Sequence, residues 1–169
     1  LIVAPFLKRA IPEAVWRERV CLVVHPGVVG DRGPSALDWA IMNGEQEWGV
    51  TVLQANAVMD GGDIWATRTF PMRAARKSSL YRNEVTEAAT AAVLEAVEKF
   101  SRGDFKPTPL DTADPNVRGT ERPLMKQDER RIDWTRDDTA TVLRKLRASD
   151  SFPGLADRIA GVDCWLFNA

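Results

Sequence analysis

The chain has 169 residues, 44% of them hydrophobic, and its 23 lysine and arginine residues nearly balance its 24 aspartate and glutamate residues. This size and composition suffice for one buried core and the beginning of a second, smaller domain. A formal net charge of -1 provides no global field that would attract a nucleic-acid backbone or an anionic membrane, so neither is an expected partner.

The sequence contains no recognisable membrane or export signal. No apolar run approaches the roughly 20 residues that span a bilayer, and no basic segment precedes a long apolar stretch at the start. Cys21 and Cys164 lie far apart in apolar runs, which is typical of buried thiols in a reducing compartment rather than of a disulfide framework. We therefore expect a cytoplasmic protein. Because residues 1–7 begin with Leu1 and already have the pattern of a strand, we also expect an N-terminally truncated fragment.

Four apolar runs predict the strands of an α/β domain. They cover residues 1–6, 20–24, 48–55 and 64–70. The first two runs are continuous rather than alternating, which favours a mostly parallel sheet that is covered on both faces.

Two helices are expected to pack against this sheet. Residues 36–43 have apolar side chains at helical spacing between Ser35, a candidate N-cap, and Gly44, a candidate stop signal. A longer amphipathic helix is expected over residues 79–100, ending near Gly103.

A change in composition after residue 105 predicts a domain boundary. Residues 106–123 contain four prolines among polar residues, which is typical of a linker, so residues 1–105 form one predicted domain. Residues 124–169 then form the start of another, with a helix that follows a capping-box-like start at 135–138 and a strand at 162–167.

The only histidine of the chain, His25, directly follows the predicted strand 20–24 and opens a loop rich in glycine and proline. In open α/β sheets, ligands bind beyond the carboxyl ends of the strands. An imidazole in that position can donate a hydrogen bond or a proton to a developing oxyanion. A surface histidine without a chemical role is the alternative interpretation.

The sequence Asp60-Gly61-Gly62-Asp63 is a second candidate for chemistry. Its glycines let the backbone approach a ligand closely, and one of its two carboxylates could orient His25 or relay a proton. An ordinary hairpin turn is the alternative, because Asp-Gly-Gly is a common turn sequence. No metal site is expected, since one histidine and two distant cysteines leave only carboxylates as ligands.

Taken in chain order, these motifs resemble the folate-dependent formyltransferase family. That family has an apolar strand ending in a catalytic histidine, an Arg-Gly pair, a W-A-I-x-x-G helix, a G-V-T strand and a D-x-G-D-I loop. The matching residues here are His25, Arg32-Gly33, 39–44, 49–51 and 60–64. Residues 125–134 and 146–154 are similar to the domain that follows the catalytic domain in the family.

The resemblance implies a fold and a set of site residues. The fold is a Rossmann-like formyltransferase core with a mostly parallel sheet, followed by the start of a smaller, β-rich, OB-like C-terminal domain. The implied donor substrate is 10-formyltetrahydrofolate, with His25 and Asp60 as the catalytic residues. The implied contacts to folate are Val58, Met59, Gly61, Gly62 and Asp63.

Within the family, residues 25–39 are most similar to members that act in the maturation of [NiFe]-hydrogenases. This resemblance implies coenzyme A as the formyl acceptor. It also implies a crotonase-like half of the parent chain that would release carbon monoxide for the hydrogenase, and no part of the 169 residues represents that half.

One residue departs from the family pattern and leaves alternatives open. Val23 occupies the position of a family asparagine whose amide helps to hold the formyl oxyanion, and losing such a donor typically costs about 100- to 1,000-fold in rate. The similarity of the C-terminal part to the family also fits a methionyl-tRNA or amino-sugar formyltransferase, and a catalytically degenerate folate-binding or scaffold domain is an alternative of another class. Tyr81 and Arg82 either lie near an acceptor or simply begin a helix.

Overall fold

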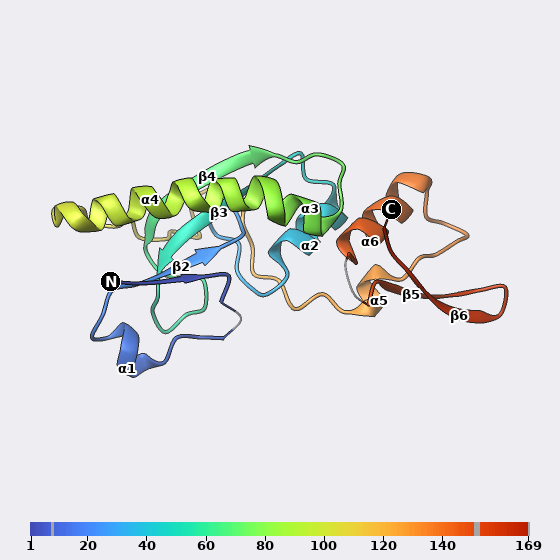
Figure 1. Ribbon diagram of the computed structural model, residues 1–169, viewed down its shortest axis with the longest axis horizontal. Helices are drawn as coiled ribbons and strands as arrows, with labels where there is room; N and C mark the ends of the chain where they lie inside the picture. Colours follow the sequence, from blue (N-terminus) through green and yellow to red (C-terminus); the bar gives the residue numbers. More distant parts are fainter. Residues whose placement is uncertain (8, 151–152, 169) are drawn as a thin grey trace.

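The computed structural model describes residues 1–7, 9–150 and 153–168, and its centre is a four-stranded sheet (Figure 1). The strands are hydrogen-bonded in the order β1 (Ile2–Pro5), β2 (Cys21–His25), β3 (Glu47–Gln54) and β4 (Ile64–Pro71). All four lie where the apolar runs predict them, and the α/β class is confirmed.

The sheet is mixed in direction. β1 pairs with β2 in parallel, whereas β2 with β3 and β3 with β4 are antiparallel. The expectation of a mostly parallel sheet therefore holds only for the first pair. Continuous apolar runs indicate that both faces are buried, but they carry no information on direction, and the short connection between β3 and β4 permits only an antiparallel pair.

Helices connect and flank the strands. The structure has α1 (Glu13–Trp16) between β1 and β2 in the chain and α2 (Ala36–Asn43) directly after the His25 loop. The long helix predicted over 79–100 consists of α3 (Lys77–Leu80), a π-helical turn (Tyr81–Val85) and α4 (Thr86–Arg102), which ends at Gly103 as expected and packs along β3 and β4. Among the described residues, no helix has the length and apolar character to cross a bilayer.

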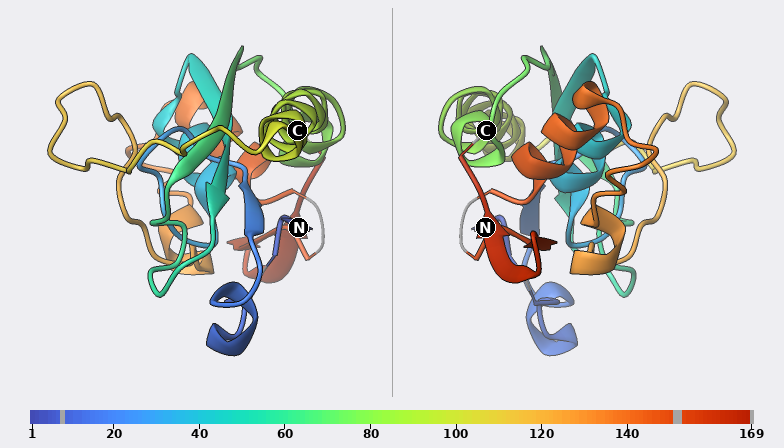
Figure 2. Two further views of the ribbon diagram at one scale, coloured as in Figure 1. Left: turned by 90° about the vertical axis from the view of Figure 1, so that its left-hand side faces the viewer. Right: turned by 90° about the vertical axis from the view of Figure 1, so that its right-hand side faces the viewer.

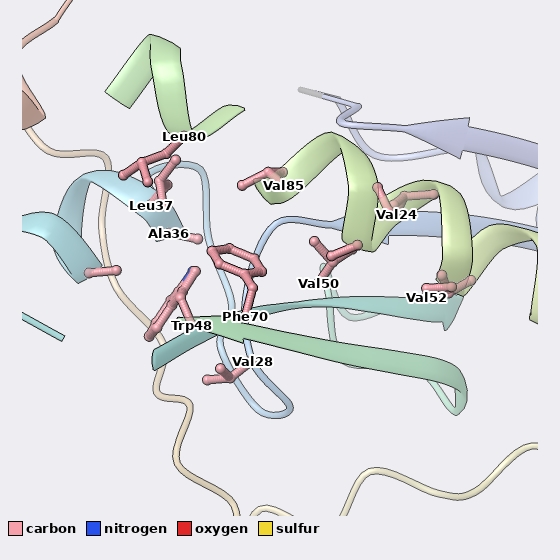
Figure 3. Packing of buried hydrophobic residues seen from close by; sticks show 14 of the residues in the cluster. Val24, Val28, Ala36, Leu37, Trp48, Val50, Val52, Phe70, Leu80 and Val85 are labelled. Carbon is pink, nitrogen blue, oxygen red and sulfur yellow. The ribbon is translucent and has the colours of Figure 1, made fainter. Parts of the chain in front are cut away.

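The apolar core lies between the sheet, α2 and α4 (Figure 3). Trp48 and Val50 of β3 and Leu37 of α2 are almost completely inaccessible to solvent. Val28, which lies three residues beyond His25, packs in the same cluster with 6% of its surface exposed. Burying a side chain of this size contributes about 1.5–3 kcal/mol. The loop after His25 is therefore anchored in the core rather than free in solvent.

The segment predicted as a linker, residues 106–123, is held against the sheet domain. Ile64 and Thr108 exchange two backbone hydrogen bonds of 2.7 and 3.0 Å, and Arg32 forms an isolated parallel bridge with Glu121. Figure 2 shows this yellow to orange segment on the side of the sheet opposite α4. The division into domains 1–105 and 124–169 with a linker between them stays a prediction.

The C-terminal part contains two helices and a hairpin. These elements are α5 (Gln127–Arg130), α6 (Thr139–Ala148), β5 (Leu155–Ile159) and β6 (Val162–Leu166), with β5 and β6 antiparallel. The N-cap of α6 is Asp138, whose carboxylate accepts the backbone N–H of Thr141 at 2.7 Å. β6 confirms the predicted strand.

Two local expectations need correction. Ser35 does precede α2, but its hydroxyl accepts the backbone N–H of Met125 at 3.1 Å instead of capping the helix. The serine therefore connects the C-terminal part to the sheet domain. β5 was not predicted, because its residues Leu155–Ile159 include Asp157 and Arg158 and lack an apolar run.

Candidate active site

His25 is the last residue of β2, and its imidazole lies between two carboxylates. The Nε2 atom is 2.8 Å from Oδ1 of Asp31, and the Nδ1 atom is 3.4 Å from Oδ2 of Asp60. Only 4% of His25 and 1% of Asp31 are exposed. The two residues that the sequence nominated for catalysis, His25 and Asp60, thus lie next to each other although 35 positions separate them in the chain.

Asp60 reaches His25 from the loop between β3 and β4. Its backbone has a φ of +52°, a left-handed conformation that aspartate adopts more readily than most residues. Its Oδ2 atom also accepts the backbone N–H of Gly33 at 3.2 Å. The Asp-Gly-Gly sequence therefore connects two antiparallel strands and also places a carboxylate near the imidazole, while a role of Asp60 in orienting His25 or relaying a proton stays a prediction.

The same loop requires glycine at position 62. A Cβ atom on Gly62 would lie 1.7 Å from the carbonyl oxygen of Gln54, which is far inside contact distance. Asn56 also braces the loop, since its side-chain oxygen accepts the N–H of Val58 at 2.8 Å. Motif reasoning missed Asn56, although asparagine commonly bonds the backbone two residues further on.

Backbone contacts fix the loop that follows His25. The carbonyl of Pro26 accepts the indole N–H of Trp48 at 2.9 Å, and that of Gly27 accepts the hydroxyl of Thr51 at 2.8 Å. The carbonyl of Val28 accepts the N–H of Asp31 at 3.0 Å. The loop is therefore held by hydrogen bonds to β3 and by a hydrogen bond within its own turn.

The segment 117–122 also forms backbone hydrogen bonds with this loop. The N–H of Gly119 donates to the carbonyl of Val29 at 3.0 Å. Arg32 donates its N–H to Thr120 at 3.2 Å and accepts the N–H of Arg122 at 3.0 Å. Sequence reasoning assigned these residues to a linker, and nothing in their composition indicates this contact.

Asp31 is a second site residue that the sequence analysis missed. It is buried, it touches the imidazole, and its Oδ2 atom has no hydrogen-bond partner among the described residues. The only sequence signal is an acidic residue six positions after the single histidine, inside a loop where aspartate is also an ordinary turn former.

Two cavities meet at this cluster. One, of about 120 Å³, is lined by residues of the β3–β4 loop, including Val58, Met59, Asp60 and Gly62. The other, of about 760 Å³, is lined by His25 and by groups from distant parts of the chain. Four residues line both cavities and form their common wall: Leu7, Val23, Met59 and Asp60.

The residues nominated for folate binding divide accordingly. Val58, Met59 and Gly62 line the smaller cavity, whereas Gly61 and Asp63 belong to the same loop but do not line it. Val58 and Met59 are about half exposed despite their apolar side chains, at 50% and 49%. Exposed apolar side chains at a cavity are typical of a surface that a ligand covers.

A charged cluster also lines the larger cavity. The carboxylate of Asp38 accepts Nζ of Lys77 at 2.9 Å and also pairs with Arg130 of α5. Burial, followed by the negative charge of Asp38, raises the pKa of Tyr81 to about 12. Tyr81 therefore stays a neutral phenol in the cavity wall, whereas Arg82 is exposed and does not line the cavity.

Val23 projects from the same face of β2 as His25, because side chains two positions apart in a strand share a face. It is part of the common wall of the two cavities. The position from which the family asparagine would reach the formyl oxygen thus holds an apolar side chain.

Comparison with known proteins agrees with this architecture. A family profile described as formyl transferase matches residues 1–97. The hydrogenase maturation factor HoxX of Bradyrhizobium diazoefficiens is 55% identical over all 169 residues, which correspond to 30% of its own length. A methionyl-tRNA formyltransferase of a Roseiflexus species is 34% identical over 132 residues, or 78% of the chain and 39% of that relative.

A solved structure also resembles this chain over nearly its whole length. The crystal structure of HypX from Aquifex aeolicus in complex with tetrahydrofolic acid superimposes with a TM-score of 0.91 and 57% identity, covering 99% of this chain and 28% of HypX. The chain thus spans about a third or less of the HoxX and HypX chains that it matches. Because the family profile covers more than half of the residues, the chain belongs to the formyl transferase family.

Proposed function

We propose that the chain transfers a formyl group from 10-formyltetrahydrofolate to coenzyme A. The observation that carries this proposal is the His25–Asp60 pair, in which Asp60 lines both cavities and His25 lines the larger one, in a chain of the formyl transferase family. One cavity would take the donor and the other the acceptor, so that the two substrates meet at the imidazole. The complex of HypX with tetrahydrofolic acid supports a folate as the donor.

The folate would bind along the β3–β4 loop. Val58 and Met59 present half-exposed apolar side chains that would cover an aromatic ring. The backbone of Gly61 and Gly62 would pair with the polar edge of the pterin, and Asp63 would lie at the rim of the site.

The reaction is acyl transfer through a tetrahedral centre. The acceptor sulfur attacks the formyl carbon, negative charge develops on the formyl oxygen, and N10 of folate leaves with a proton. His25 stabilises the oxyanion or carries the proton, while Asp60 orients His25 or accepts the proton of the acceptor through water. A thiol needs less help from a base than an amine, because its pKa is nearer to neutral.

The biological role that we propose is the first step in making the carbon monoxide ligand of [NiFe]-hydrogenase. The similarity to HoxX and HypX supports it. A crotonase-like half of the parent chain would act on the product. Both cysteines of the chain are free thiols, which fits a cytoplasmic site of action.

Two alternatives make different predictions. Similarity to methionyl-tRNA formyltransferases favours an amine acceptor, and the net charge of -1 argues against a tRNA. The valine at position 23 favours a domain that binds folate without turnover.

The test is binding of a stable 10-formyltetrahydrofolate analogue by calorimetry, together with formyl transfer to coenzyme A and to amines. The expected result is binding by the parent protein and loss of transfer in His25→Ala and Asp60→Ala. Glu98→Gln, at an exposed position on α4, is the control and should behave as the parent. Transfer to an amine in preference to coenzyme A would overturn the acceptor assignment, and binding without transfer would support the scaffold alternative.

A further inference from the structure

Asp31 has a chemical relation to His25 that the formyl-transfer proposal does not use. Its carboxylate lies 2.8 Å from Nε2 of the imidazole, a shorter distance than the 3.4 Å between Nδ1 and Asp60. We propose that Asp31 is a positioning residue, which holds the proton of His25 on Nε2 and thereby turns Nδ1 toward Asp60 and the reacting formyl group. This inference rests on the proposed function for its kinetic consequences.

The position of the proton follows from the contact. With the Asp31 carboxylate as the acceptor of the 2.8 Å contact, the proton lies on Nε2. The hydrogen bond made by one ring nitrogen determines the state of the other, and Nδ1 is then the nitrogen that can take up or release a proton. Nδ1 is also the nitrogen that faces Asp60. Asp31 and Asp60 therefore act on different atoms of the same ring.

The surroundings of Asp31 show that the contact is structurally fixed. A Cβ atom on Gly27 would lie 2.5 Å from Nε2 of His25 and 2.7 Å from Oδ1 of Asp31, so no side chain fits beside this hydrogen bond. A Cβ atom on Gly119 would lie 1.8 Å from the backbone nitrogen of Asp31. Gly27 thus packs against the side-chain contact between His25 and Asp31, and Gly119 packs against the backbone of Asp31.

The orientation of the His25 ring matters because Val23 supplies no polar group at the position of the family asparagine. In the absence of the family asparagine, His25 lines the larger cavity next to Asp60 of the common wall, and its imidazole can both donate and accept a proton. A ring that rotates freely would lose part of the transition-state stabilisation, because catalysis depends on groups that are already oriented.

The first test is a long-range proton–nitrogen NMR spectrum of the His25 ring, assigned by its absence in His25→Gln. The expected signature is a neutral ring that carries its proton on Nε2. A ring that carries its proton on Nδ1 would make Asp31 the donor and would overturn the proposal. This measurement needs no turnover, so it decides the role of Asp31 even if formyl transfer fails.

Kinetics of three variants give the second test. Asp31→Ala removes the acceptor and is expected to lower kcat about 10- to 100-fold, with the KM for folate nearly unchanged and the Nε2–H signature lost. Asp31→Asn keeps an acceptor oxygen and should retain part of the activity. Gly27→Ala keeps both functional groups but separates them, and it should reproduce the effect of Asp31→Ala.

Two controls separate positioning from stability. Asp150 is an equally buried carboxylate, 2% exposed, that accepts the N–H of Ser78 at 3.0 Å and lies outside both cavities. Asp150→Ala should lower the melting temperature but leave the ring signature of His25 intact. Glu98→Gln, at an exposed position on α4 that lines neither cavity, should leave kcat as in the parent. A kcat of Asp31→Ala within about threefold of the parent, or a lower kcat with an unchanged ring signature, would overturn the proposal.

Discussion

The hydroxyl of Thr51, which is 1% exposed in the middle of β3, donates a 2.8 Å hydrogen bond to the carbonyl oxygen of Gly27. Thr51 is also the strand partner of His25 across the antiparallel β2–β3 pair. One residue of the sheet thus faces the catalytic candidate and holds the loop that follows it. Rigid support of this kind is what an active-site loop needs in order to place its side chains reproducibly.

Replacing Thr51 with valine should therefore affect both stability and activity. The carbonyl of Gly27 would remain buried without its donor, and an unsatisfied buried polar group costs about 1–3 kcal/mol of unfolding free energy. Thr51→Ser, which keeps the hydroxyl, should stay closer to the parent. Denaturant unfolding and formyl-transfer kinetics measure the two effects, and equal stability of the valine variant and the parent would contradict the expectation.

Substitution at Gly62 should weaken folate binding. A methyl group on Gly62 would collide with the carbonyl oxygen of Gln54, so the β3–β4 loop must shift. We expect Gly62→Ala to lower the affinity for a folate analogue by at least about tenfold, equivalent to about 1.4 kcal/mol, in a calorimetric titration.

Gly161→Ala is the control for this loop. It adds the same methyl group in the turn between β5 and β6, where no atom lies within 4 Å. The φ of +81° at Gly161 strains an alanine there, but the residue lines neither cavity, so the variant should retain the parent affinity. Unchanged binding by Gly62→Ala would show that the loop can move without consequence for folate.

The valine at position 23 predicts a change in acceptor preference. Val23→Asn would place an amide on the face of β2 that also carries His25. Since one oxyanion donor is worth about 100- to 1,000-fold in kcat, transfer to amines should rise relative to transfer to coenzyme A. Rates for both acceptors, measured side by side, provide the test. If neither the rate nor the preference changes, the valine does not explain the choice of acceptor.

Tyr81 predicts a pH dependence at alkaline pH. Burial and the charge of Asp38 raise the pKa of Tyr81 to about 12, whereas an unfolded tyrosine titrates near pH 10. The raised value means that the stabilising contribution is complete below about pH 10 and is lost as the pH rises toward 12, at a cost of about 3 kcal/mol at most.

Comparison of the parent with Tyr81→Phe isolates this effect. Ultraviolet difference titration should place the tyrosinate transition of Tyr81 near pH 12, and the variant should lack the corresponding loss of stability. Tyr81 is the only tyrosine of the 169 residues, so the difference spectrum has one origin. A transition near the ordinary pH of 10 would mean that Tyr81 is accessible to water.

Much of the fold could be predicted from local patterns. The four strands, α2 and α4 follow from apolar periodicity and from stop signals such as Gly44 and Gly103, because these patterns depend on neighbouring residues. Strand direction and β5 could not be predicted in this way. Strand direction depends on how the chain returns to the sheet. β5 contains charged residues and lacks an apolar run, and it forms a strand because it pairs with β6.

The candidate site was predicted in part, for a similar reason. His25 and Asp60 belong to motifs with a family pattern, so the sequence nominated both. Asp31 and Asn56 have no such pattern, and their roles arise from contacts formed only when the loops are folded. The contact between Met125 and Ser35 joins residues 90 positions apart, which no local pattern can indicate.

The backbone contacts of residues 117–122 have a practical consequence for dividing the protein. A chain cut after residue 105 would retain every catalytic candidate, but it would remove the three backbone partners of Val29 and Arg32 and uncover the turn that carries Asp31. Such a shortened chain should bind folate poorly even if its sheet folds. The smallest unit worth expressing for enzymology therefore includes the proline-rich segment, because its backbone hydrogen bonds hold the loop that carries Asp31.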